Sequence, residues 1–167
     1  RGPGLIIDGS SCSIQSANGV GVYEGAHHIV LEDLEVRNTN GVGIDFYHYP
    51  TDCRVIRVKV HDTGRFTQQS PPQVYGMYLN GHRNIIENSE VYNTTGWGIH
   101  AYSGEFVDAH IIRNNWIHNT NTTNADPNGG GGLLLFSVGG GSNQIDNNVI
   151  SATNNTMAAV YISGGNG

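Results

Sequence analysis

The stretch Ile86–Tyr102, "IENSEVYNTTGWGIHAY", contains one full unit of a repeat. It runs from an aliphatic residue through a polar run to a second aliphatic residue, Val91, and then through an Asn-Thr turn to a glycine-led strand. The stretch Leu31–Tyr47, "LEDLEVRNTNGVGIDFY", has the same length and the same order of residue types. Self-similarity of this kind is the signature of a repeat architecture.

The second aliphatic position recurs along the chain. Its members are Val36, Val60, Val91, Ile117 and Ile150, with Ile14 in the same role in a weaker first copy. Their spacings after Val36 are 24, 31, 26 and 33 residues. The irregularity falls in two insertions rich in loop-forming residues, Gly64–Val74 and Asn121–Gly131.

Short strands, tight turns and a variable period favour a parallel β-solenoid, in which stacked coils share one core. An antiparallel β-sandwich also has short strands and frequent turns. It does not, however, predict the same order of residue types in every unit. We therefore expect an all-β chain: a right-handed, single-stranded parallel β-helix of about six coils. It should form one domain over residues 1–167, as part of a longer solenoid or as a stacking unit.

Composition agrees with this fold and narrows the partners. The chain has 24 glycines, one lysine (Lys59) and a net charge of −6. Glycine and asparagine favour turns, whereas Val, Ile, Thr and Tyr favour strands. The negative charge argues against binding to nucleic acid, and no apolar run has the length of a membrane-spanning helix.

Successive side chains of each glycine-led strand point alternately into the coil and away from it. The inward set is Ile44/Phe46, Met77/Leu79, Ile99/Ala101, Leu133/Leu135 and Val160/Ile162. The first outward ladder is Tyr23, Asp45, Tyr78, His100, Leu134 and Tyr161. The second outward ladder is Tyr47, Asn80, Tyr102, Phe136 and Ser163.

Asparagines repeat in the polar run of each unit. Asn88, Asn114 and Asn147 recur at one position, and Asn115 and Asn148 come next in line. Identical amides at one turn of a stack can form hydrogen bonds along its axis. These asparagines are therefore interpreted as a structural ladder.

The repeats resemble those of the right-handed parallel β-helix proteins, the pectate-lyase-like superfamily. The stretch "GMYLNGHRNIIENSEVYNTTGWGIHAYSG" carries the resemblance, which covers nearly the whole chain from Ile14 to Ile162. It implies the coil but not one activity, since the superfamily includes polysaccharide lyases, glycoside hydrolases, epimerases, phage tailspikes and adhesins. Function must be argued from a site.

The candidate site is a patch of outward residues on the central coils: Asp45, Tyr47, Tyr78, Asn80, His100 and Tyr102. Coils stacked about 4.8 Å apart would spread this patch over roughly 10 Å, about two sugar rings. Aromatic rings with polar handles, beside Asn, Asp and His, suit a sugar-binding groove. The expected substrate-binding residues are Asp45, Tyr47, Asn80, His82 and Arg65. The two insertions should form walls that bring Arg65, Gln68, Gln69 and Asp126.

Catalysis at this patch would take one of two forms. In a polysaccharide lyase, His100, Tyr78 or Tyr102 would be the base, assisted by Asn80, His82, Arg83 or Arg65. A glycoside hydrolase needs two carboxyl groups, and only Asp45 lies on the predicted face, with Glu105 and Asp126 in nearby loops. The lyase reading fits better, although exposed Tyr and His residues are also ordinary surface. No metal or cofactor is expected.

Three sequons point to a secreted glycoprotein. They begin at Asn93, Asn121 and Asn154, although a chain rich in Asn and Thr also produces such triplets by chance. Cys12 and Cys53 occupy different points of the repeat, so no disulfide is expected.

The sequence thus predicts an extracellular or cell-surface β-helix that binds or cleaves polysaccharide. The alternative is a structural or adhesive filament segment, because the open strand edges at the ends of a solenoid invite end-to-end self-association.

Overall fold

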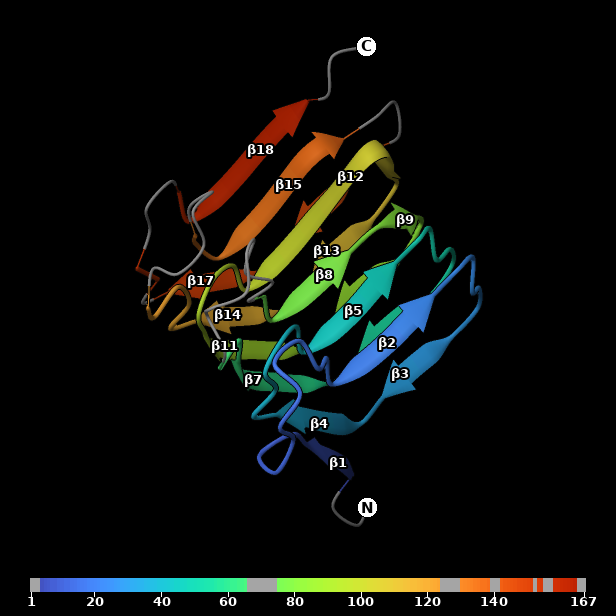
Figure 1. Ribbon diagram of the computed structural model, residues 1–167. Coiled ribbons are helices and arrows are strands. Elements are labelled where there is room, and N and C mark those ends of the chain that lie inside the picture. The colour runs from blue at the N-terminus through green and yellow to red at the C-terminus, as the bar shows by residue number, and fades with distance from the viewer. Residues whose placement is uncertain are drawn as a thin grey trace.

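The computed structural model confirms the solenoid. It describes residues 4–65, 75–123, 130–138, 142–151, 153–154 and 158–164, without the side chains of 103–108 and 136–138. In this part of the chain, all strands pair in parallel and form three sheets that run the length of the stack (Figure 1). No helix in these residues is long and apolar enough to cross a membrane.

Each coil contributes one strand to each sheet in turn. The first sheet contains β1 (Leu5–Asp8), β4 (Leu34–Arg37), β7 (Lys59–Thr63), β11 (Glu90–Thr94), β14 (Trp116–His118) and β17 (Val149–Ser151). The second contains β2 (Val20–Tyr23), β5 (Ile44–Tyr47), β8 (Met77–Leu79), β12 (Ile99–Asp108), β15 (Leu133–Val138) and β18 (Val160–Gly164). The third contains β3 (Val30–Glu32), β6 (Arg54–Ile56), β10 (Ile85–Glu87), β13 (Ile111–Arg113) and β16 (Gln144–Asp146). The short strand β9 (Gly81–His82) pairs with the far end of β12.

The core is a set of aliphatic columns between the sheets. The recurring second aliphatic position is confirmed, because Val36, Val60, Val91, Ile117 and Ile150 pair in register along the first sheet. The first copy was predicted wrongly. Ile7, not Ile14, pairs with Val36, and Ile14 is exposed at a turn.

A single residue in the left-handed conformation joins the third sheet to the first in each coil. These residues are Asp33, Arg57, Asn88, Asn114 and, in the last such turn described, Asn147. Asn and Asp tolerate positive φ better than other L-residues do. This backbone requirement explains the recurring asparagine, so the prediction of a ladder at Asn88, Asn114 and Asn147 was wrong.

The amide ladder predicted at the next position, Asn115 and Asn148, is confirmed. The Asn115 side chain donates to Asn148 Oδ1 at 3.0 Å and accepts from the Ser89 backbone N–H at 2.9 Å. Asn148 in turn donates to the Ile112 carbonyl. Because Asn115 is buried, these bonds satisfy polar groups that would otherwise be costly to bury.

Candidate functional site

The second sheet places the predicted patch on neighbouring coils. Asp45 pairs with Tyr78, and Tyr78 pairs with His100, as the alternation predicted. The first outward ladder, however, begins at Gly21, which pairs with Asp45. Tyr23 pairs with Tyr47 and belongs to the second ladder. The glycine that leads β2 is therefore Gly19, in the column of Gly43.

The two outward ladders differ in exposure, which the alternation did not predict. Asp45 and His100, from the first ladder, are buried at 5% and 8% exposure. They lie beside a second apolar cluster on the outside of the coil. This cluster is Val42, Tyr75, Trp97 and Leu134, with Tyr78 and Tyr161 packed against it.

The tyrosines of the second ladder remain open to solvent, whereas Asn80 between them is buried. Tyr23, Tyr47 and Tyr102 have exposures of 44%, 39% and 39%, and we call these three residues the tyrosine strip. The Tyr23 and Tyr47 rings meet edge to face, with centroids 6.2 Å apart. All three side chains expose part of an apolar ring that carries a hydroxyl group at its edge.

Asn80 lies in the strip's ladder between Tyr47 and Tyr102. Its Nδ2 donates to the Tyr102 carbonyl at 3.3 Å, and its Oδ1 accepts from the Tyr49 backbone N–H at 3.3 Å. Asn80 therefore braces the backbone under the tyrosines.

A family comparison is consistent with this architecture. The family model described as "Right handed beta helix region" matches residues 5–167. The chain belongs to the right-handed β-helix family. Comparisons of this β-helix with curated proteins and with solved structures found no match. Its function must therefore be argued from its own residues.

Asp45 is the acidic group at the centre of the β-helix patch. Its Oδ2 accepts hydrogen bonds from Asn18 Nδ2 at 2.6 Å and from the Tyr23 hydroxyl at 2.9 Å. Burial raises the pKa of the Asp45 carboxyl above its ordinary value, and the bond from Tyr23 opposes that rise. It is the one carboxyl group among the described side chains of the second-sheet strands. Glu105 and Asp126, the other predicted candidates, lie outside the described side chains.

His100 is poorly suited to act as a base. Neither ring nitrogen has a hydrogen-bond partner. Its nearest ring contacts are Tyr75, edge to face at 4.3 Å, and Tyr78 at 5.5 Å. Burial lowers the pKa of His100 to about 3, so its imidazole is uncharged at neutral pH and far weaker than a base tuned to that pH.

Tyr78 is equally unsuited. Its hydroxyl donates to the Tyr102 carbonyl at 3.0 Å, and burial raises its pKa to about 12. Deprotonation of Tyr78 near neutral pH is therefore unfavourable, and its hydroxyl proton is already donated to a carbonyl group. The arrangement of Asp45, Tyr78 and His100 favours a braced binding surface over a proton-transfer centre.

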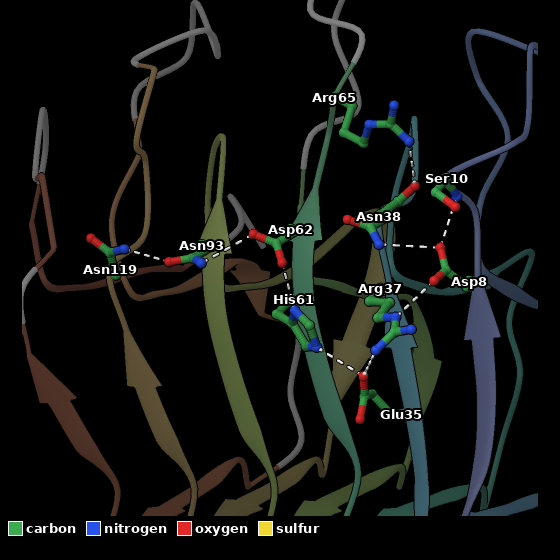
Figure 2. Close-up of polar contacts among 10 residues, drawn as sticks. All are labelled: Asp8, Ser10, Glu35, Arg37, Asn38, His61, Asp62, Arg65, Asn93 and Asn119. Atoms are coloured by element: carbon green, nitrogen blue, oxygen red, sulfur yellow. Dashed lines mark hydrogen bonds and ion pairs between the residues drawn. The ribbon is translucent and has the colours of Figure 1, made fainter.

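Two predicted substrate-binding residues lie away from the patch. His82 follows Gly81, whose φ of +86° turns the chain out of the line of β8, and its backbone bridges to Thr51. Arg65 points to the turns after β1 and β4, where Nη1 donates to Asn38 O at 3.2 Å (Figure 2). The Arg65 side chain does not border the tyrosine strip. Gln68 and Gln69 lie outside the described residues.

The three sequons differ in access. The Asn121 side chain is fully buried, so the folded coil leaves no room for a glycan there, and the expectation at this site is corrected. Asn93 is half-buried in a row with Asp62 and Asn119 (Figure 2), and its Nδ2 donates to Asp62 Oδ1 at 3.0 Å. Asn154 is exposed.

Both cysteines are free thiols. The described residues include no group of three or more His, Cys, Asp or Glu that could hold a metal ion.

A second candidate surface was missed. The outward side of the first sheet carries four rings in contact, those of His61, Tyr92, His118 and Trp116. The signal was present, because "VKVH", "SEVY" and "NWIH" alternate around the same aliphatic column as the other repeats.

Proposed function

We propose that this β-helix binds carbohydrate along the tyrosine strip, outside the cell or at its surface. The observation that carries the proposal is the row Tyr23, Tyr47 and Tyr102, each about two-fifths exposed, on one face of a rigid stack. With one coil about 4.8 Å from the next, the row extends over about 14 Å. That length accommodates an extended oligosaccharide parallel to the helix axis.

The chemistry of the strip supports binding. Aromatic faces pack against the C–H groups of sugar rings, and hydroxyl and amide groups fix their orientation. The hydrogen bonds of Tyr23 and Asn80 to neighbouring coils hold the surface in shape before a ligand arrives, which lowers the entropy cost of binding. The low pKa of His100 and the high pKa of Tyr78 disfavour the lyase form of the proposal.

Tyr47→Ala should weaken binding to soluble polysaccharides about tenfold, as expected for the loss of one aromatic platform. Retardation in polysaccharide-containing native gels measures this. Tyr49→Ala is the matched control, because Tyr49 is similarly exposed but lies beyond the end of β5.

Equal losses in the two variants, or no retardation of the wild type by any polysaccharide, would contradict the proposal. The same mixtures tested with uronate polymers should form no unsaturated product that absorbs ultraviolet light. Such a product would restore the lyase form.

End-to-end association is a second candidate role, supported by the apolar side chains of the last described coil. Ile162 is 60% exposed, whereas Leu135, its partner in register one coil earlier, is 1% exposed. We propose that this end of the stack accepts the first coil of a second copy, where Leu5 is also exposed. Both edges would then continue parallel pairing.

Light scattering should show assemblies that grow with protein concentration, and Ile162→Lys should abolish them, because a buried unpaired charge is strongly unfavourable. A wild type that stays monodisperse at every concentration would rule this role out. The result is independent of carbohydrate binding.

A further inference from the structure

The outer face of the first sheet has two columns of polar and aromatic side chains. The column nearer the third sheet is Glu35, Lys59, Glu90 and Trp116. The column nearer the turn to the second sheet is Arg37, His61, Tyr92 and His118. This face is distinct from the tyrosine strip, which belongs to another sheet.

The four rings of this face form one continuous stack. His61 and Tyr92 lie 4.5 Å apart and within 6° of parallel, and Tyr92 and His118 lie 5.0 Å apart at the same angle. Trp116 closes the stack on His118, with centroids 4.0 Å apart and an interplanar angle of 26°. Its indole N–H also faces Ser151 Oγ at 3.4 Å. Trp116 is therefore held from two sides, yet its side chain is 48% exposed.

Trp116 forms one side of an open groove at the corner between the third and first sheets. The groove has a volume of about 380 Å³, and its polar and aromatic lining includes Arg57, Lys59, Asn88, Glu90, Asn114 and Trp116. The groove is shallow and open to solvent, so it would hold one side of an extended ligand.

Two amides in the groove are available to a ligand. Asn88 and Asn114 occupy the left-handed turn position on successive coils, with φ of 54° and 56°, and both side chains are exposed. Neither side-chain amide has a hydrogen-bond partner among the residues that the structure describes. They repeat at the coil spacing of about 4.8 Å, close to the length of one pyranose ring in an extended chain.

The charges around the groove are neutralised in place. Glu90 lies 3.3 Å from Lys59 Nζ and 3.2 Å from His118 Nε2. Arg57 pairs with Asp33 at 2.7 Å and also with Glu32. Further along the face, Arg37 bridges Asp8 and Glu35 (Figure 2). A polyanion would have to displace these partners, whereas an uncharged ligand would not.

We propose that this groove binds a neutral oligosaccharide, with Trp116 as the stacking platform and the amides of Asn88 and Asn114 as hydrogen-bonding groups. The site stands on its own residues and does not require the tyrosine strip to bind. If both surfaces bind, one molecule holds two glycan chains on different faces and can cross-link them.

The test uses neutral hexasaccharides of β-linked glucose, N-acetylglucosamine and mannose, titrated against the whole chain. Trp116 is the exposed one of the two tryptophans, since Trp97 is fully buried, so at least one sugar should change the fluorescence saturably. The apparent Kd should change little with salt, as expected for an uncharged ligand. A hexamer of galacturonate should not compete.

Trp116→Ala should weaken binding of the sugar about tenfold, measured by calorimetry. Asn114→Gly should also weaken it and should fold normally, because glycine accepts positive φ without strain. Tyr47→Ala should leave this Kd unchanged, so failure here and failure of the tyrosine strip are distinguishable.

Wild-type affinity in both Trp116→Ala and Asn114→Gly would overturn the proposal. So would saturable binding of the galacturonate hexamer alone, or no response to any neutral sugar. In the last case the exposed groove would instead be tested as a surface for a protein partner.

Discussion

Gly76→Ala should destabilise the β-helix by at least about 3 kcal/mol, because the column that contains Gly76 has no room for a methyl group. A Cβ at this position would lie 2.4 Å from Val91 Cγ1 and 2.5 Å from the Gly98 carbonyl oxygen. The carbonyl belongs to the backbone of the next coil and cannot move without breaking the ladder of the second sheet. For a domain of this size, that loss lowers the Tm by roughly 6 to 12 °C.

The chain provides a matched control. A Cβ at Gly164 would meet nothing within 4 Å, and its φ is not positive, so Gly164→Ala should leave the Tm unchanged. The sequence itself has alanine at an equivalent position in the last described coil, where Ala159 occupies the position held by Gly132 one coil earlier. Thermal unfolding followed by circular dichroism measures both variants. A Gly76→Ala protein as stable as the wild type would show that the coils do not stack as closely as described.

His100 should make the protein sensitive to acid. Its pKa is about 3 in the folded state, against an ordinary value of 6.5, because burial removes the charged imidazolium from water. The unfolded chain therefore binds a proton between these two values while the folded chain does not, so stability falls as the pH drops below 6.5. The free energy of unfolding should fall by about 3 kcal/mol between pH 7 and pH 4 through this group.

His100→Leu isolates this contribution. Leu134 follows His100 in the same column of the second sheet, so leucine suits the environment. Urea unfolding at pH 7 and at pH 4 should show a smaller loss for the variant, by about the amount above. Other titrating groups affect both proteins and cancel in the comparison. Equal losses in the two proteins would mean that water or a proton reaches His100 in the folded state.

Sequence patterns predicted the fold because the backbone preferences that produce them act within a single coil. Alternation along a strand separated inward from outward residues, and the recurring second aliphatic residue marked the core. The errors were of register: Ile7 replaces Ile14, Tyr23 belongs to the second outward ladder, and of the predicted asparagines only Asn115 and Asn148 form the amide ladder. A weak first copy and a run of adjacent asparagines do not specify register, which depends on the neighbouring coil.

The candidate site was only partly predictable. Alternation correctly brought Asp45, Tyr78 and His100 together, but it could not show that Asp45 and His100 are buried while Tyr47 and Tyr102 are open. His82 and Arg65 were misplaced because bends after β8 and β7 redirect them. The groove at Trp116 was not predicted, because it lies on the first sheet and the candidate site was placed on the glycine-led strands of the second.

The amino-acid order alone establishes an all-β coil with its inward columns, because strand alternation, glycine and left-handed turns act over a few residues. Exposure, ring stacking and charge pairing are properties of the stack. The ring of His118 stacks on Tyr92 from the coil before, and the charge of Glu90 is neutralised by Lys59 from the coil before. The residues of each pair lie far apart in the chain and become neighbours only when successive coils stack.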